Sequence, residues 1–264
     1  MTKVLTDEQV QQMISEYRQG DSTGVLGNRY GITRWSIRGL LERREIPRHP
    51  VGSARTIPLD ESAFDNITEH SAYWAGFLMA DGCISYQDHH SPAIILILSA
   101  QDEAHLERFR AFLKSDHKIR KYSRTDSFST NPKVCYQVRS RRLVSALSRF
   151  GITAGKSTLG YVRHLDTNRH FWRGLIDGDG SLFETRKKYL GLALCGTETL
   201  LEQFDSFIRI FKPDAGSSIR FISGTFVLRC NTKTSRAVAK HLYQNCSVYL
   251  PRKKTIVDGW NESA

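Results

Sequence analysis

The sequence predicts an α+β protein in which a small all-α unit precedes an α-β-β-α-β-β-α unit that occurs twice. Three observations predict this architecture. Roughly the first fifty residues have only helical periodicity. A segment with several prolines and glycines follows them and separates them from the rest. From about residue 60 onward, one order of motif, strands and helices is repeated.

The length and composition are those of an ordinary globular protein. The chain has 264 residues, 40% of them hydrophobic and 25% charged, so it can bury one large core or two modest ones. The longest aliphatic run, Ala93–Leu98, is too short to cross a bilayer, and the start lacks a secretory pattern. We therefore expect a cytoplasmic, nucleoid-associated protein without a membrane partner, and the N-terminal unit described below adds the expectation of a prokaryotic or phage host.

The charge balance favours a polyanionic partner. The formal net charge is +11, and basic residues gather in two stretches, residues 117–142 and 216–240. The five cysteines are scattered singly and have no metal-ligand spacing. We expect them to be reduced and buried, with no zinc site.

The N-terminal unit has the pattern of three short helices. We expect a helix over Leu5–Gln19, a second from a cap at Ser22 or Thr23 through Tyr30, and a third, capped by Thr33, over Arg34–Glu45. Gly27 provides a small residue where two helices cross, and Gly31 provides the turn. Five apolar residues fall where a helix-turn-helix buries its side chains: Leu26, Tyr30, Ile32, Ile37 and Leu40.

This spacing resembles the helix-turn-helix of DNA invertases and resolvases. The resemblance implies that the third helix enters a major groove, with four residues outward: Arg34, Trp35, Ser36 and Arg38. The alternative is a helical hairpin that only packs on another domain. The linker that follows contains Arg48 and Arg55, and it is either a minor-groove arm or a solvated tether.

A ten-residue motif occurs twice in the rest of the chain. Tyr73–Gly82 reads YWAGFLMADG, and Phe171–Gly180 reads FWRGLIDGDG, with a constant offset (172 − 74 = 98 and 179 − 81 = 98). Each copy is followed by two strands, a helix, two basic strands and a closing helix. An internal repeat of this size indicates two copies of one structural unit.

The motif has small residues four positions apart on one helix face. Gly76 and Ala80 in the first copy correspond to Gly174 and Gly178 in the second, which allows two helices to pack backbone to backbone. Such packing would bring Asp81 and Asp179 together at adjacent helix ends. Because two close carboxylates repel unless cations or protons intervene, we expect a site for a hard divalent metal. The alternative is a pair of core helices whose terminal carboxylates are merely solvated.

These two motifs resemble those of the LAGLIDADG homing endonucleases in their single-chain form, over about residues 60 to 258. The resemblance implies metal-dependent hydrolysis of both DNA strands by Asp81 and Asp179, with the backbone carbonyls of Ala80 and Gly178 as further ligands. We expect Mg²⁺, with Mn²⁺ as a substitute. It also implies a monomer, either intron-encoded or free-standing, that binds double-stranded DNA at a long specific site.

The resemblance further implies one lysine per half near the scissile phosphates. Lys156 and Lys254 each lie 75 residues beyond their aspartate (156 − 81 and 254 − 179), in what we expect to be the loop after the last helix. Lys253 could take the role of Lys254. The basic strands and loops then provide the DNA-contacting residues Lys118, Arg120, Lys121, Arg124, Lys133, Gln137, Arg139, Arg186, Lys187, Lys188, Arg220 and Arg229.

Two motif positions depart from the family pattern. Met79 replaces an acid that Asp177 retains, so we assign Asp177 to helix capping or packing. Arg173 replaces a small residue. Bacterial transcription regulators use the same fold without the acids, so a regulator that binds DNA without cleaving it is the alternative function. We divide the chain into a helix-turn-helix domain (1–48), a basic linker (49–62) and two LAGLIDADG halves (63–160 and 161–264).

Overall fold

The computed structural model describes residues 5–18, 21–47, 57–88, 90–122, 132–155, 160–184 and 189–262. Seven predicted site residues lie outside these ranges: Arg48, Arg55, Arg124, Lys156, Arg186, Lys187 and Lys188. The contacts divide the chain into two compact units, Met1–Ile57 and Pro58–Ala264. Each unit is described by itself.

The first unit contains the helices α1 (Asp7–Arg18), α2 (Thr23–Tyr30) and α3 (Arg34–Arg43). The Ser22 and Thr33 side chains cap α2 and α3, and Gly31 ends α2 in the left-handed conformation with φ 69°. A Cβ at Gly27 would stand 2.8 Å from the Ile32 carbonyl oxygen, so this position requires glycine. Eight side chains form the core: Val10, Met13, Ile14, Tyr17, Leu26, Ile37, Leu41 and Ile46.

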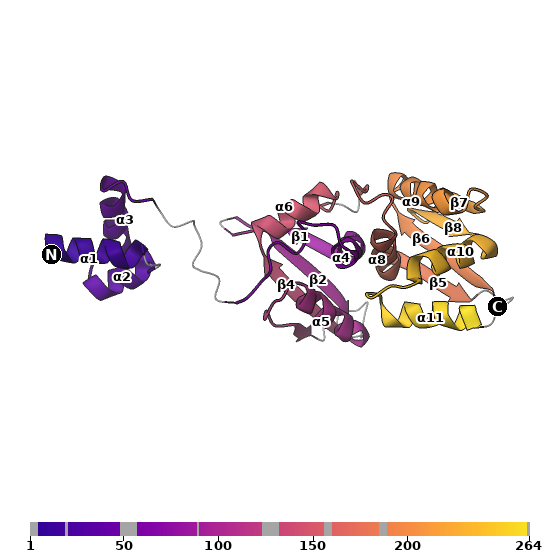
Figure 1. Cartoon of the computed structure of the whole chain (residues 1–264), viewed down its shortest axis with the longest axis horizontal. Coiled ribbons are helices and arrows are strands. Elements are labelled where there is room, and N and C mark those ends of the chain that lie inside the picture. The colour runs from indigo at the N-terminus through magenta and orange to yellow at the C-terminus, as the bar shows by residue number, and fades with distance from the viewer. Residues whose placement is uncertain are drawn as a thin grey trace. The chain divides into compact units, whose positions relative to one another are not determined.

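The second unit consists of two halves with the same order of elements (Figure 1). The first half contains α4 (Glu69–Ala80), β1 (Gly82–Ser85), β2 (Ala93–Ser99), the 3₁₀ turn η1 (Ala100–Asp102), α5 (Glu103–Phe112), β3 (Arg120–Tyr122), β4 (Lys133–Arg139) and α6 (Arg141–Arg149). The second half contains α8 (Arg169–Asp179), β5 (Gly180–Glu184), β6 (Leu190–Gly196), α9 (Glu198–Phe211), β7 (Ser217–Ile222), β8 (Thr225–Cys230) and α10 (Thr232–Tyr243).

Each half forms a four-stranded antiparallel sheet, in the orders β1-β2-β4-β3 and β5-β6-β8-β7. The predicted α+β class and the duplicated α-β-β-α-β-β-α order are therefore confirmed. The helix α11 (Pro251–Glu262) was not predicted. It follows α10, where we expected a loop. Pro251 occupies the first helical position, where the missing N–H has no intrahelical partner to lose.

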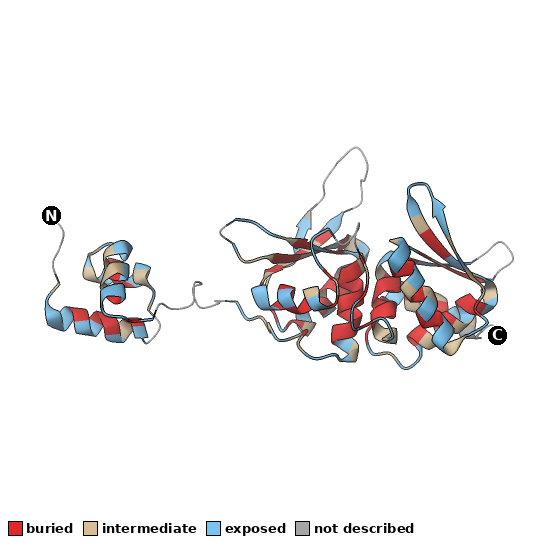
Figure 2. Ribbon diagram, turned by 90° about the horizontal axis from the view of Figure 1, so that it is seen from above, coloured by how far each residue is buried: buried red, intermediate tan, exposed pale blue. Residues whose placement is uncertain are grey.

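The core of the second unit is centred on α4 and α8, whose ribbons are almost entirely buried in Figure 2. Strand alternation defines the two faces of each sheet. In β4 the buried Val134, Tyr136 and Val138 face the helices, so the intervening residues face away from them. We call the side of each sheet that faces away from the helices its open face. In the described part of the chain, no helix is long and apolar enough to cross a membrane.

Candidate active site

The helices α4 and α8 pack backbone to backbone at the two motif glycines. A Cβ at Gly76 would stand 1.9 Å from the Phe171 carbonyl oxygen, and one at Gly174 would stand 2.0 Å from the Tyr73 carbonyl oxygen. No side chain fits at either distance. The packing expected from the spacing of the small residues therefore occurs, and it joins the two halves.

The same contact continues to the ends of the helices. A Cβ at Gly178 would stand 2.3 Å from the Ala80 Cβ and 3.3 Å from Asp81 Oδ2. The Asp81 carboxylate thus lies beside the residue that precedes Asp179, and both aspartates are exposed. The structure brings together the four predicted metal-site positions at one point of the interface between the halves.

These positions offer oxygen donors only. Two carboxylates and two backbone carbonyls suit a hard cation such as Mg²⁺. Among the described residues, no group of three or more His, Cys, Asp or Glu side chains gathers to hold a metal. The donor set fits Mg²⁺, provided that water or substrate oxygens supply its remaining ligands.

Gly82 and Gly180 follow the aspartates and start the first strand of each half. Neither has a positive φ. A Cβ at Gly82 would stand 2.6 Å from the Leu78 carbonyl oxygen, and one at Gly180 would stand 2.6 Å from that of Ile176. The glycines are needed for this close approach of the strand to the helix end.

Lys253 is the lysine that the structure brings to the end of α8. Its side chain is buried, and Nζ donates to the carbonyl oxygens of Ile176 at 2.6 Å and Gly180 at 2.6 Å. Desolvation lowers the pKa of Lys253 to about 8, an effect that the nearby Asp177, Asp81 and Asp179 partly oppose. Sequence reasoning named this residue only as a substitute for Lys254.

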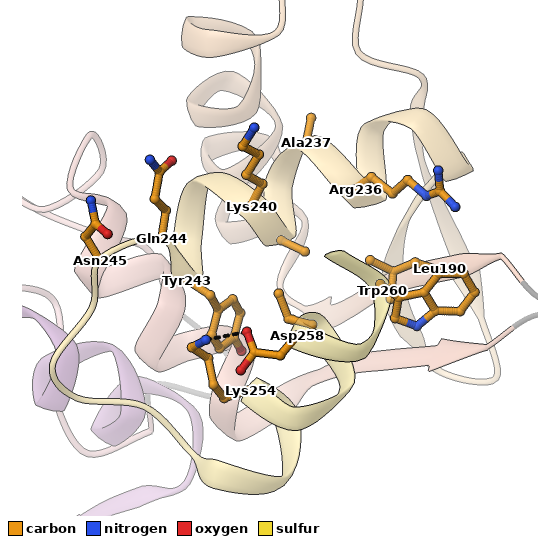
Figure 3. Close-up of a pocket in the computed structure, with 12 residues that line it drawn as sticks. Leu190, Arg236, Ala237, Lys240, Tyr243, Gln244, Asn245, Lys254, Asp258 and Trp260 are labelled. Atoms are coloured by element: carbon orange, nitrogen blue, oxygen red, sulfur yellow. Dashed lines mark hydrogen bonds and ion pairs between the residues drawn. The ribbon is translucent and has the colours of Figure 1, made fainter. Parts of the chain in front are cut away.

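Lys254 lies elsewhere, in the first turn of α11 instead of in a loop. Its Nζ pairs with Asp258 Oδ1 and stands 5.8 Å from the centre of the Tyr249 ring. Figure 3 shows this ion pair in a pocket between α10 and α11 that is also lined by Arg236 and Trp260. Lys254 is thus held by an ion pair within α11, whereas Lys253 binds the end of α8 directly.

A buried polar cluster lies behind the aspartates, and its centre is Asp177. Asp177 accepts hydrogen bonds from Tyr243 Oη at 2.5 Å, from Tyr73 Oη at 2.7 Å and from the Leu250 backbone N–H at 2.7 Å. Burial raises the pKa of Asp177, and these hydrogen bonds partly offset that rise. Burial also raises the pKa values of both tyrosines well above their usual range. The expected packing role of Asp177 therefore takes the form of a buried hydrogen-bond network.

His105 extends this cluster into the first half, and sequence reasoning missed it. Its Nε2 lies 2.9 Å from Tyr73 Oη, while its Nδ1 is buried without a hydrogen-bond partner. Desolvation lowers the pKa of His105 to about 3, with smaller contributions from Arg108 and Arg252. The imidazole is therefore neutral in the folded protein at neutral pH. Its position within α5 gives no signal of this burial beyond the apolar periodicity of Leu106 and Phe109.

Arg173 is also completely buried and connects the two halves. Its guanidinium donates to Glu69 Oε1 at 2.8 Å, to the Leu242 carbonyl oxygen at 3.0 Å and to the Val248 carbonyl oxygen at 2.9 Å. Glu69 belongs to α4, so this ion pair crosses the interface between the halves. Arg173, which replaces a small residue of the family pattern, therefore joins the two halves through its side chain.

The first sheet presents basic and polar side chains on its open face. The register places Cys135 between Ile97 and Arg120, so Arg120 shares this face. Three further predicted residues occupy the positions of β4 that alternate with its buried residues, so they lie on the open face too: Lys133, Gln137 and Arg139. Lys118 is exposed just before β3.

Lys121 lies on the other side of the first sheet. It pairs with Val134 in the register and forms an ion pair of 2.6 Å with Glu103. It is therefore not brought together with the other basic residues of this sheet.

The second sheet places Arg220 and Arg229 on its open face. Arg229 pairs with Ala193, and Arg220 pairs with Val227. Cys195 and Cys83 are also exposed, and the other three cysteines are partly buried. Our expectation that the cysteines are buried is therefore wrong, because strand alternation turns Cys83 and Cys195 away from the core.

In the first unit, α3 presents three of its four predicted DNA contacts to solvent. Trp35 is 64% exposed, and the guanidinium carbons of Arg34 and Arg38 stand 5.5 and 5.0 Å from its ring centre. The Ser36 hydroxyl lies 3.0 Å from that of Thr33, at the helix cap. The exposed group on α3 therefore consists of Arg34, Trp35 and Arg38.

Two halves joined by glycine-containing helices that end in aspartates define the LAGLIDADG fold, and comparison with solved structures agrees. The homing endonuclease I-WcaI, bound to its DNA recognition sequence, is similar with a TM-score of 0.53 and 13% identity, over 75% of this chain and 91% of that one. Mesophilic variants of the homing endonuclease I-DmoI are similar with a TM-score of 0.50 and 16% identity, over 75% of this chain and 98% of theirs. No family model and no curated protein sequence matches the chain.

Proposed function

We propose that the chain is a site-specific endonuclease of the homing type, which hydrolyses phosphodiester bonds in both strands of DNA. One observation carries this proposal. It is the contact of Gly178 with Ala80 and Asp81, which joins the two helix ends that carry the aspartates. Arginines on the open face of each sheet are consistent with this proposal. The similarity in fold to a homing endonuclease bound to its DNA recognition sequence supports it.

In this proposal, Asp81 and Asp179 hold Mg²⁺, together with the backbone carbonyls of Ala80 and Gly178. We expect Mn²⁺ to substitute. When bound, the cation polarises the scissile phosphate and stabilises the departing 3′ oxygen. Lys156 and Lys254 remain our proposed partners for the attacking water or for the negative charge of the transition state.

The DNA lies along the two open faces. Arg120, Lys133, Gln137 and Arg139 contact it in the first half, and Arg220 and Arg229 contact it in the second. One chain contains both halves, so a monomer is sufficient to cut both strands. We further propose that the N-terminal unit is a helix-turn-helix and that α3 contributes Arg34, Trp35 and Arg38 to a major-groove contact.

The test uses DNA that contains the insertion site of the encoding locus without the insert. We expect wild-type protein to cut both strands with Mg²⁺ and neither strand in EDTA, and we expect Asp179→Asn to bind the DNA without cutting it. Tight binding without cleavage under every divalent metal would contradict the endonuclease and favour the DNA-binding regulator.

A deletion of residues 1–50 tests the role of the first unit. We expect the deletion to weaken DNA affinity more than it slows single-turnover cleavage. An unchanged affinity would contradict a DNA-binding role for the N-terminal unit.

A further inference from the structure

The open faces of the two sheets can be compared position by position, because their strands pair in the same order. In the first sheet, Ile95 of β2 pairs with Cys83 of β1 on one side and with Gln137 of β4 on the other. We call these three residues the Ile95 row. Cys83 is exposed, and Ile95 and Gln137 are partly exposed. All three alternate with buried residues along their strands, so they lie on the open face.

The second sheet contains an equivalent row. Ala193 of β6 pairs with Ser181 of β5 and with Arg229 of β8, and we call these three residues the Ala193 row. Each row begins two positions after an aspartate of the candidate site, and Ala193 lies 98 positions after Ile95 (193 − 95 = 98). The two rows are therefore related by the internal repeat and stand at equivalent places beside the site.

The two rows differ in chemistry. A branched aliphatic side chain lies beside an amide in the Ile95 row, whereas a single methyl group lies beside a guanidinium in the Ala193 row. The neighbouring row of each sheet keeps its chemistry, since Cys135 pairs with Arg120 in the first sheet and Val227 pairs with Arg220 in the second. The two halves therefore present different groups at one equivalent point.

The residues around the Ile95 row favour DNA as the occupant of this face. Lys133 and Arg139 lie on the same face at the two ends of β4, and Arg120 of β3 lies beside them. Among the strand residues whose side chains the structure describes, the open face of the first sheet carries no acid. Phosphates would bind the basic side chains, which leaves the aliphatic and amide groups for base edges.

The side chains of the two rows match different base pairs in the major groove. Thymine presents a methyl group there, and adenine presents an N7 acceptor and an N6 donor that one amide can bind together. An isoleucine beside a glutamine therefore fits an A·T pair. Guanine presents two acceptors, N7 and O6, which match the donors of an arginine. An alanine beside an arginine therefore fits a G·C pair.

We propose that the Ile95 row reads an A·T base pair and that the Ala193 row reads a G·C base pair at the mirror-related position of the DNA target. The Ile95 side chain packs on the thymine methyl group, while Gln137 donates to adenine N7 and accepts from adenine N6. Arg229 donates to guanine N7 and O6. The inference rests on the proposed function and deepens it, because it names residues that make the two half-sites different.

The first experiment uses the wild-type protein and DNA that contains the insertion site of the encoding locus without the insert. Each base pair is changed in turn to the other three, and the dissociation constant is measured in EDTA. We expect one position to prefer A·T and its mirror position to prefer G·C, each by at least about fivefold. Deoxyuridine, which lacks the methyl group, then replaces the thymine of the first position, and affinity should fall about fourfold.

The second experiment exchanges the chemistry of one row. The double variant of Ile95→Ala and Gln137→Arg gives the Ile95 row the aliphatic and basic groups of the Ala193 row. We expect this variant to prefer G·C at the former A·T position, to lose the effect of deoxyuridine and to keep the preference at the mirror position. The matched control is Gln244→Arg, which adds the same charge at an exposed residue outside the sheets and should leave both preferences unchanged.

The outcomes separate the inference from the proposed function. An A·T preference that survives in the double variant, or one and the same preference at both mirror positions, would overturn the inference while the wild-type protein still binds and cleaves the target. Absence of both binding and cleavage by the wild-type protein would instead refute the endonuclease. If the double variant does not fold, the wild-type protein decides, because unchanged affinity for the deoxyuridine DNA would overturn the contact with the thymine methyl group.

Discussion

The Tyr73 hydroxyl of α4 donates a hydrogen bond of 2.7 Å to Asp177 Oδ2 of α8, and this bond crosses the interface between the two halves. Both side chains are completely buried. The 98-residue repeat would place an equivalent acid at position 79, where this chain has methionine. The interface thus combines an apolar contact between glycines with a polar contact that has no symmetric copy.

Removal of the Tyr73 hydroxyl should destabilise the second unit. Tyr73→Phe leaves the Asp177 carboxylate with one hydrogen bond fewer and also removes the partner of His105 Nε2. We expect a loss of about 1–3 kcal/mol in the free energy of unfolding, measured by urea denaturation. The control Tyr86→Phe changes a side chain that is 63% exposed and should have no measurable effect. Equal effects of the two changes would contradict the network.

The glycine contact between α4 and α8 should tolerate no methyl group. Gly76→Ala places a Cβ 1.9 Å from the Phe171 carbonyl oxygen, so the helices must separate. We expect a loss of stability of at least about 2 kcal/mol, beyond the usual cost of overpacking a core. The control is Gly259→Ala in α11, where nothing lies within 4 Å of the added Cβ. There the higher helix propensity of alanine should add up to about 1 kcal/mol of stability. A neutral Gly76→Ala would show that the helices do not pack as described.

The buried Arg173–Glu69 pair should contribute far more than a surface pair. Arg173→Met leaves the Val248 and Leu242 carbonyls without this donor and removes the ion pair that joins the halves. We expect a loss of about 3–5 kcal/mol, because a broken buried pair leaves unpaired polar groups behind. The exposed pair of Arg209 and Asp205 is the matched control, and Arg209→Met should cost less than about 1 kcal/mol. The melting temperatures of the two variants are compared by thermal denaturation. Similar melting temperatures of Arg173→Met and Arg209→Met would contradict the prediction.

His105 should make the fold sensitive to mild acid. Its pKa is about 3 in the folded protein, below the ordinary value of 6.5, so the unfolded chain binds the proton more readily. Stability from this group is therefore complete above pH 6.5 and falls as the pH decreases towards 3, by about 1.4 kcal/mol per pH unit.

The measurement for His105 is the free energy of unfolding at pH 7.5 and at pH 5. The wild type should lose about 2 kcal/mol more than His105→Gln between these values. The variant His90→Gln, at an exposed site, should retain the wild-type slope. A His105→Gln variant with an unchanged slope would show that His105 does not titrate in this way.

Periodicity and repetition were sufficient to predict most of the fold. The constant offset between Trp74 and Trp172 indicated the duplication, and strand alternation predicted two pairs of strands in each half, as the structure has them. The contact at Gly76 and Gly174 followed from steric reasoning alone. These features are local or repeated, so the sequence expresses them directly.

The polar contacts could not be predicted, because they join residues far apart in the chain. Nothing in the local pattern of Arg173 indicates Glu69, which lies 104 positions earlier, or Val248, which lies 75 positions later. Pro251 is typical of a loop in the sequence, but it begins α11. Lys254 therefore lies in the first turn of a helix and not in a loop, and Lys253, named only as its substitute, is the lysine that is buried.

The central claim is that Asp81 and Asp179 together hold the metal that cleaves DNA. The most direct measurement is single-turnover cleavage with Mg²⁺ by wild type, Asp81→Asn, Asp179→Asn and the control Asp214→Asn, whose exposed carboxylate pairs with Lys212. We expect double-strand cleavage to be abolished in both site variants, unchanged in the control, and accompanied by nearly wild-type DNA affinity throughout. Full-rate cleavage by either Asp81→Asn or Asp179→Asn would contradict the metal assignment.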